Sequence, residues 1–536
     1  MFAEVSRPSA SASGWASRRS LSGRASPETP SIQIAVLPSI GPPRVPHGRK
    51  GQSPPPPSRA RDIVGALRFQ ILDAADRVAI DEATRVLLEE TGASVRSAVA
   101  RATLARSGAA VEPHGDRVRF PEPVVREALR SAPRVVVLAS RDGKRDLRLP
   151  DGKPHITTDG CGVQVRDLET GERRPSTTKD LADLTRVADA LDVVDVQWPM
   201  CVAGDVPREI HNLVEGAVVF ENTTKNVQAE AVSASDAKAL VAMAAEIAGG
   251  PKELRRRPVL SSVQCPVSPL ILEAGSTDGL IVLAQAGVPV VPISMVLLGG
   301  SSPVDLASAI VLANAENLAS MCVAQAAAAG APVIYGVSSG PIDMRTGSYA
   351  SGSPESALLE AAGAEMARHY GLPCLIGGFG CDADDVGFQG GAERMGNGLI
   401  AMLEGADLIA GIGGLETDST MSAEQLVLDA DLIEYARKAI EGVRVDADTV
   451  HLDMLQRLGP GGNYLKERHT LANFRKALWS PGLLLREGHV AGLPSEARLR
   501  ARAKARASEL LKAHRPDPLP EDVRRTIWDI AEGRRR

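Results

Sequence analysis

The sequence predicts an α/β protein built as a (β/α)8 TIM barrel. Four short apolar runs carry this prediction, at residues 288–294, 331–336, 372–377 and 406–411. Each is rich in β-branched or aliphatic residues, closes on Gly or Ser and follows an Ala-rich helical stretch. Such continuous apolar runs are typical of parallel strands buried on both faces. They begin about 34 to 43 residues apart, which matches one strand-plus-helix unit of a parallel sheet.

The repeating region contains seven predicted strands, and we expect an eighth nearby. The seven lie at residues 193–198, 226–231, 259–264, 290–294, 333–337, 374–378 and 408–412. Helical segments such as 233–247 and 353–370 separate them. A barrel is favoured over an open doubly wound sheet, because no GxGxxG motif follows any of these strands.

Flanking segments divide the rest of the chain. Residues 1–60 are rich in Ser, Arg and Pro, which predicts a disordered or mispredicted extension in preference to a transit peptide. Residues 61–150 mix helical and strand patterns and should form an N-terminal α+β cap. The barrel domain is then expected over 151–480, opening with a hairpin within 155–167. Charged helical segments at 481–536 predict a C-terminal helical extension.

Composition excludes several classes of protein. The net charge of −5 and pI near 6.1 give no electrostatic reason to expect nucleic acid as a partner. The six Cys residues contain no CxxC pair, as expected for reduced thiols in a cytoplasmic protein. No apolar run reaches 18 uninterrupted residues, so no membrane span is expected.

The predicted strands end in polar residues, and in a barrel these ends meet at one mouth. Four acids stand at such positions or in the predicted hairpin: Asp159, Glu230, Asp382 and Glu416. Together they would make the mouth acidic and suited to a cationic ligand. Asp343 and Asp418 also follow strands, but for these two we favour capping of the next helix.

Glycines and one histidine are the candidates for holding a large cofactor. Gly378, Gly380, Gly413 and Gly414 follow the sixth and seventh predicted strands and could let a planar group approach the backbone. The alternative is that they only form tight turns. His469 stands just before a predicted helix and is either a functional group or a structural hydrogen-bonding residue.

Metal and covalent chemistry find little support in the sequence. The Cys and His residues lack metal-ligand spacing, so no bound metal is predicted. Cys265 and Cys381 could be nucleophiles, but a small buried residue is the preferred interpretation. A lyase or aldolase would need a Schiff-base lysine, and Lys225 stands at the start of a strand, the wrong end for a barrel site.

Several motifs resemble the trimethylamine methyltransferase superfamily over roughly residues 65 to 490. They occur in order at residues 167–181, 343–347, 352–355, 371–373, 389–393 and 462–470. The resemblance implies a (β/α)8 enzyme that moves a methyl group from an amine to the Co(I) of a separate corrinoid protein. Members that act on trimethylamine contain pyrrolysine, and this chain has none in residues 377–385, where it would be sought.

The absence of pyrrolysine favours the relatives that act on glycine betaine. A quaternary ammonium is an activated methyl donor, because its leaving group is a neutral tertiary amine. Aromatic faces and carboxylates recognise such a cation, which makes Tyr335, Phe379 and Phe388 candidates beside the acids. Gln228, Gln264 and Ser339 could hydrogen-bond the tail of the substrate.

We therefore predict a methyltransferase that uses a betaine-like quaternary amine. Glu230, Asp382 and Glu416 are its expected catalytic residues. Its partner would be a corrinoid protein whose cob(I)alamin accepts the methyl group to give methylcobalamin. We also expect the protein to be a homo-oligomer. Trimethylamine methyltransferase proper and a non-catalytic betaine-sensing barrel remain as alternatives.

Overall fold

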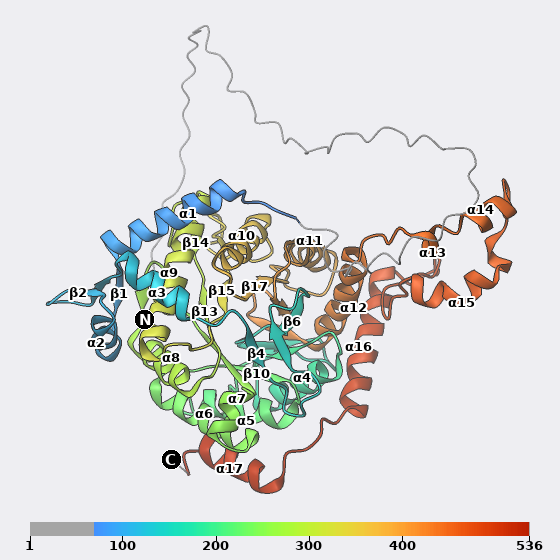
Figure 1. Cartoon of the computed structure of the whole chain (residues 1–536). Coiled ribbons are helices and arrows are strands. Elements are labelled where there is room, and N and C mark those ends of the chain that lie inside the picture. The colour runs from blue at the N-terminus through green and yellow to red at the C-terminus, as the bar shows by residue number, and fades with distance from the viewer. Residues whose placement is uncertain (1–68, 535–536) are drawn as a thin grey trace, which may run out of the picture. The chain divides into compact units, whose positions relative to one another are not determined.

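Eight parallel strands close into a barrel in the computed structural model, which describes residues 69–534 (Figure 1). The order around the barrel is β10-β11-β13-β15-β17-β18-β6-β9. The strands are β6 (His155–Thr158), β9 (Val196–Gln197), β10 (Asn226–Glu230), β11 (Leu260–Gln264), β13 (Val290–Ser294), β15 (Tyr335–Val337), β17 (Cys374–Gly378) and β18 (Leu408–Ile412). Because β6 pairs with both β18 and β9, the sheet has no edge, and an open doubly wound sheet is excluded.

A helix follows each barrel strand and packs outside it. These helices are α4 (Thr178–Ala190), α5 (His211–Asn222), α6 (Ala234–Ala248), α8 (Ala274–Ala286), α9 (Leu306–Ala327), α10 (Pro354–Tyr370), α11 (Phe388–Glu404) and α12 (Ala423–Ile440). A short helix, α7 (Pro251–Arg256), follows α6. The predicted (β/α)8 fold is thus confirmed.

The eighth strand lies where the sequence predicted a hairpin, and that prediction is wrong. Residues 155–158 form barrel strand β6, and β7 (Gln164–Arg166) does not pair with it. Instead β7 pairs with β8 (Arg173–Pro175) and with β20 (Thr420–Ser422), which pairs in turn with β19 (Gly414–Leu415). The glycines after β6 therefore lead out of the barrel mouth and not around a tight turn.

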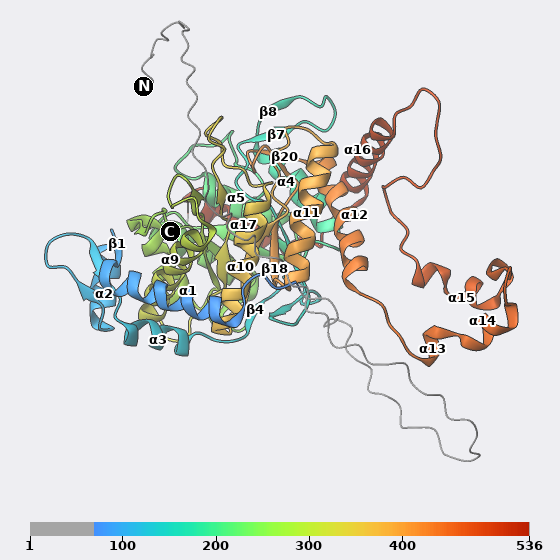
Figure 2. The same cartoon turned by 90° about the horizontal axis from the view of Figure 1, so that it is seen from above.

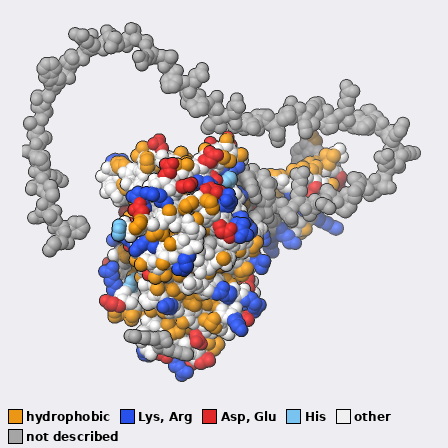
Figure 3. Space-filling model, turned by 60° about the vertical axis from the view of Figure 1, so that its left-hand side comes forward, with side chains coloured by type: hydrophobic (Ala, Val, Ile, Leu, Met, Phe, Trp, Pro, Cys, Tyr) orange, Lys and Arg blue, Asp and Glu red, His pale blue; other side chains and the backbone are white. Residues whose placement is uncertain are grey.

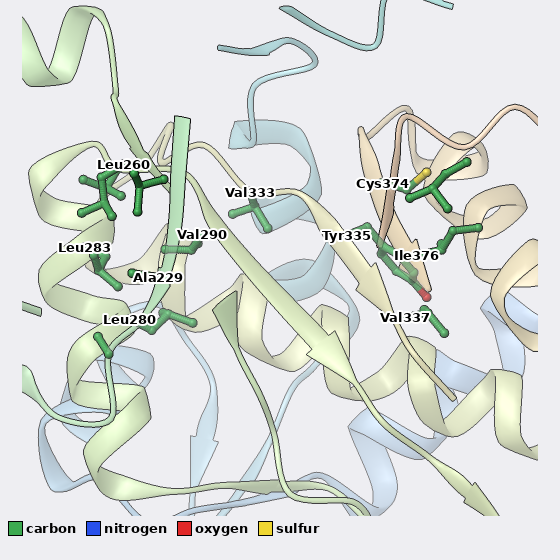
Figure 4. Packing of buried hydrophobic residues seen from close by; sticks show 14 of the residues in the cluster. Ala229, Leu260, Leu280, Leu283, Val290, Val333, Tyr335, Val337, Cys374 and Ile376 are labelled. Carbon is green, nitrogen blue, oxygen red and sulfur yellow. The ribbon is translucent and has the colours of Figure 1, made fainter. Parts of the chain in front are cut away.

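Two layers of apolar residues surround the strands. The outer layer fills the space between strands and helices, where Ala229, Val290 and Ile376 pack (Figure 4). The inner layer joins Val263, Val291 and other inward residues to the hairpin of β4 (Val136–Leu138) and β5 (Leu147–Leu149). This hairpin closes the end of the barrel at which the strands begin, so access to the interior is left to the opposite, carboxyl-terminal end.

Further elements flank the barrel. Residues 74–131 form α1 (Ala74–Val86), a π-helical turn at Leu87–Thr91, β1 (Ala93–Val95), α2 (Ala98–Arg106), β2 (Ala110–Val111), β3 (Arg117–Arg119) and α3 (Glu122–Ser131). Strand β1 pairs with β12 (Ile271–Leu272), and β14 (Leu297–Leu298) pairs with β16 (Gly340–Pro341). The predicted extension at residues 1–60 lies outside the described residues.

Helix α9 is long and apolar enough to cross a bilayer by length and composition, but 78% of that window is buried inside the molecule. It packs against α1, α3, α8 and strand β13 as a core helix of the barrel. On the face drawn in Figure 3, Lys and Arg side chains are interspersed with Asp and Glu.

After α12 the chain leaves the barrel in an arm and then returns. The arm holds α13 (Ala447–Val450), α14 (Leu452–Leu458), a 3-10 turn (Tyr464–Lys466) and α15 (Arg468–Ala477). These helices stand clear of the barrel in both views (Figures 1 and 2). The chain then forms α16 (Ser495–Ala513), which packs on α12 and α4, and α17 (Glu521–Ala531), which packs on α5 and α6.

Candidate active site at the barrel mouth

Three successive residues after β6 reach three different parts of the barrel mouth. Oδ2 of Asp159 lies beside Gly414, just after the end of β18. Gly160 lies against the indole of Trp198, so closely that a Cβ there would come within 2.5 Å of the ring. The Sγ of Cys161 lies 3.4 Å from Oε1 of Glu230. Residues 159–161 thus form the centre of the candidate site.

Asp159 and Asp418 form a close pair of carboxyl groups. Asp159 is buried, and its Oδ1 accepts a hydrogen bond from the backbone of Gly160, whereas its Oδ2 has no partner. Oδ1 of Asp418 is also buried and without a partner. Burial and the neighbouring Asp418 carboxyl raise the pKa of Asp159 well above its usual range. Two neighbouring carboxylates cannot both be ionised without repulsion, so Asp159 favours its protonated form.

The loop that carries Asp418 has a strained backbone. Glu416, Thr417 and Asp418 all have positive φ angles, of 51°, 54° and 67°, although non-glycine residues avoid this region at a cost of about 1–2 kcal/mol each. The backbone N–H groups of Glu416 and Thr417 hold it by donating to the carbonyls of Ala383 and Cys381. Strain of this kind persists where a surrounding structure enforces it, commonly at functional sites. Here it directs Asp418 toward Asp159.

Glu360 enters the mouth from helix α10 through a gap left by a glycine. A Cβ at Gly377 would lie 2.1 Å from Oε1 of Glu360, so only glycine leaves room for this carboxyl group. Glu360 is buried, and burial followed by the charge of Asp418 raises its pKa well above the usual range. Among the described residues, Asp159, Glu360 and Asp418 have no ion-pair partner. The mouth therefore holds several carboxyl groups without a direct ion pair, although the charge of Arg394 acts on Asp159 and lowers its pKa in part.

Strand β10 contributes Gln228 and Glu230. Their neighbours Val227 and Ala229 pack in the outer layer, so the alternation of a strand directs Gln228 and Glu230 into the barrel. Gln228 is fully buried, and neither its amide nitrogen nor its oxygen has a partner. Burial raises the pKa of Glu230, and the nearby carboxylate of Glu215 adds to this, while the hydrogen bond from Cys161 opposes it. An unpaired buried amide of this kind is suited to a ligand or water.

None of the three predicted aromatic residues lies in the mouth. Tyr335 packs in the outer layer (Figure 4), and its hydroxyl donates to Oδ1 of Asn314. Phe379 is fully buried against Gly398 of α11. Phe388 begins α11 and is 87% exposed beside a surface groove. Trp198, which was not among the predicted aromatic residues, packs on the inner layer, and its Nε1 has no partner.

Two further predicted ligand residues are used by the protein itself. Gln264 faces helix α8, where Thr277 and Leu280 adjoin it, and its Nε2 donates to Ser262 Oγ. Ser339 accepts from the backbone N–H of Val296. The structure thus gives both side chains contacts within the protein and does not bring Gln264 to the mouth, because the alternation of β11 directs it outward.

Asp382 and Glu416 lie at the mouth but bind neighbouring parts of the loops. Oδ1 of Asp382 accepts from Ser351 Oγ, Gly352 N and Thr417 Oγ1 at 3.1–3.2 Å. Oε2 of Glu416 accepts from Nε of Arg173 at 2.7 Å and from Thr420 Oγ1 at 2.7 Å. Both acids thus fix the loop that carries Asp418.

Side chains of the protein itself occupy the space beside each glycine that was predicted to bind the cofactor. The space beside each contains Ile409 at Gly378, Ser351 at Gly380, Met200 at Gly413 and Asp159 at Gly414. The glycines therefore serve packing, and the open approach predicted for a planar group is not present beside them. His469 lies in α15 of the arm with its ring 4.1 Å from that of His451, so the structure does not bring it to the mouth.

Lys225 has a structural role at the end of helix α4. Its Nζ donates to the carbonyls of Ala188 and Leu191 at the end of α4, and burial lowers its pKa to about 7. It precedes β10 and so lies at the closed end of the barrel, which removes the basis for Schiff-base chemistry at the mouth.

We expect the two glutamates to respond differently to neutralisation. Glu230→Gln removes a charge that burial disfavours and should lower kcat/KM about ten- to a hundredfold without lowering the thermal midpoint. Glu416→Gln weakens a half-exposed pair with Arg173, which should cost at most about 1 kcal/mol of stability and leave kcat/KM nearly unchanged. Steady-state kinetics and thermal unfolding of both variants check this. Equal losses of kcat/KM would contradict the assignment.

An α/β barrel with an acidic mouth defines the class of protein, and comparisons place it in a family. A model of trimethylamine methyltransferase (MTTB) matches residues 47–536. The chain is 33% identical over 456 residues to trimethylamine methyltransferase MttB of Desulfitobacterium hafniense, covering 85% of this chain and 92% of that protein. It is 30% identical over 458 residues to the glycine betaine methyltransferase of strain Y51 of that species, covering 85% and 95%. The chain belongs to the trimethylamine methyltransferase (MTTB) family.

A solved structure similar to this chain is the Methanosarcina barkeri monomethylamine methyltransferase MtmB. The TM-score is 0.47 at 11% sequence identity, covering 81% of this chain and 92% of that one. Relatives at comparable sequence identity are thus named both for trimethylamine and for glycine betaine.

Proposed function

We propose that the protein transfers a methyl group from a betaine-like quaternary amine to the Co(I) of a corrinoid carried by a separate protein. The observation that carries this proposal is a group of carboxyl side chains at the mouth that form no ion pair of their own. These are Asp159, Glu360 and Asp418, and the indole of Trp198 adjoins Gly160, the residue after Asp159. Carboxylates together with an indole face are the groups that stabilise a quaternary ammonium.

The proposed reaction needs little acid–base chemistry from the protein. The C–N bond of the ammonium breaks, its electron pair stays on nitrogen, and the methyl carbon bonds to the cobalt nucleophile supplied by the partner. The chain's own residues would hold the cation, align the C–N bond with the open end of the barrel and exclude water. Gln228 supplies unpaired hydrogen-bonding groups for the tail of the substrate.

A spectroscopic assay tests the substrate class. The enzyme is mixed with a reduced corrinoid protein and with glycine betaine, choline or trimethylamine in turn, and loss of the Co(I) absorption is followed. We expect loss with the quaternary amines and none with trimethylamine. The reverse preference would overturn the choice of quaternary substrate and favour trimethylamine methyltransferase proper.

The aromatic contact has its own test within that assay. Trp198→Leu keeps apolar volume but removes the ring, and we expect it to weaken substrate handling by about 1–2 kcal/mol, or about five- to thirtyfold. Trp528→Leu is the matched control, because this indole lies outside the barrel and donates to Glu221. A non-catalytic sensor would instead bind the amine in calorimetry yet leave Co(I) unchanged.

A further inference from the structure

The arm after α12 carries apolar side chains that no part of residues 69–534 buries. Its helices α13, α14 and α15 contain no buried residue. The most exposed apolar side chains on the arm are Val443, Val445, Leu465, Leu471 and Leu478, at 65–86% exposure. Several large apolar side chains this exposed on one short segment are typical of an interaction site.

The same chain carries an apolar groove between α11, α12 and α16. Its volume is about 540 Å³, and the residues Val386, Phe388, Met395, Leu428, Leu432 and Leu499 line it. Phe388 projects there with 87% of its surface exposed. The groove therefore offers an apolar receptor that is independent of the barrel mouth.

Charges at the two surfaces are complementary. Glu496 lies on the rim of the groove beside Gly387, and no ion pair involves it among the described residues. Arg475 and Lys476, in the last turn of α15, also have no ion-pair partner within residues 69–534. Contact between the arm and the groove would pair these charges at the edge of an apolar centre, as in specific interfaces.

The base of the arm is fixed, which directs the arm outward. Helix α12 leads straight into it, and at the other end the carboxylate of Asp431 accepts hydrogen bonds from the backbone N–H groups of Gly482, Leu483 and Leu484. Leu484 also lines the groove, so an incoming segment would pack beside the base of the resident arm. The arm itself points away from the barrel in both views (Figures 1 and 2).

We propose that two copies of this chain exchange arms, each arm packing its apolar side chains into the α11–α12–α16 groove of the other copy. Every chain carries both surfaces, so one contact brings the reciprocal contact and the assembly closes with twofold symmetry. The exchange would cover the exposed apolar side chains of two arms at once, and burial of apolar surface is what stabilises such an interface. This inference does not depend on the reaction catalysed.

The mass of the full-length chain in solution tests the exchange. By analytical ultracentrifugation at micromolar concentration we expect wild type to be a dimer or a multiple of it. Phe388→Asp in the groove and Leu471→Glu on the arm should each weaken the dimer at least tenfold, with unchanged circular dichroism. Val304→Asp is the matched control, because Val304 is 67% exposed in the loop before α9 and should leave the mass unchanged.

Mixing the two variants distinguishes a second copy from other occupants of the groove. A Phe388→Asp chain retains an intact arm and a Leu471→Glu chain retains an intact groove, so an equal mixture should recover a heterodimer through one contact. A wild-type monomer, an association that appears only with a corrinoid protein, unchanged masses in both variants, or no recovery on mixing would each overturn the exchange.

Discussion

Arg394→Met is expected to destabilise the barrel by about 3–5 kcal/mol, the usual cost of removing one partner of a buried ion pair. Arg394 in α11 is fully buried, and its Nη1 lies 3.2 Å from Oδ2 of Asp429. The same guanidinium donates to the carbonyls of Phe379, Gly411 and Gly414. Its loss would leave a buried carboxylate without a cation and would remove a donor from three carbonyls near the ends of β17 and β18.

Denaturant unfolding followed by circular dichroism measures this loss. The double variant Arg394→Met/Asp429→Asn should be more stable than Arg394→Met alone, because the lone charge is gone and the amide oxygen can still accept from Gly413 N–H. Arg130→Met, at an exposed pair with Glu127, should show no measurable change. If Arg394→Met unfolds like wild type, the guanidinium does not organise the mouth.

Asp159→Asn is expected to stabilise the folded protein at pH 8 and to lower kcat/KM by about ten- to a hundredfold. The pKa of Asp159 is raised in the folded state, so the folded protein retains a proton that the unfolded chain releases above about pH 4. Stability therefore falls as pH rises from that value toward the folded pKa. An asparagine has no such dependence and keeps the acceptor for Gly160 N–H.

Thermal unfolding of both proteins from pH 4 to pH 8 checks this prediction. We expect the two midpoints to lie close together at pH 4 and the variant to gain on wild type as pH rises. Thr420→Val, which alters a buried polar residue of the neighbouring hairpin without changing a titratable group, controls for general effects on the mouth. A variant that loses stability at pH 8 would show that the ionised Asp159 is satisfied in the fold.

The barrel could be predicted from the sequence because its signal is local. Runs such as residues 290–294 and 408–412 are apolar on both faces, and the helices between them have characteristic lengths. Strand β6 was missed because His155, Thr157 and Thr158 are polar. They are buried here by contacts with β18 and β9, which lie far away in the sequence.

The site was predictable only in part, because strand ends indicate an edge but not the direction of each side chain. The structure brings the predicted residues Asp159, Gln228 and Glu230 to the mouth, because they lie in or directly after strands that direct them inward. Gln264 and Tyr335 also belong to barrel strands, but the alternation of side chains along the strand directs both of them outward. Trp198 ends a predicted strand, and that position was the available signal for it.

Two residues of the mouth carried no sequence signal that we could use. Glu360 belongs to a helix, and only the gap at Gly377 lets it reach the mouth. Asp418 was expected to cap a helix, yet three successive positive φ angles direct it toward Asp159. Both depend on tertiary contacts, which a local pattern does not contain.

The β4–β5 hairpin has a kinetic consequence for the proposed reaction. The side chains of the hairpin close one end of the barrel, so substrate and methyl acceptor must use the same opening. The residues that close it are Val136, Leu138, Leu147 and Leu149. The amine must then bind before the corrinoid protein does, and the demethylated amine can be released only after the corrinoid protein dissociates. We therefore expect compulsory-order kinetics, in which excess corrinoid protein inhibits turnover because it blocks entry of the amine.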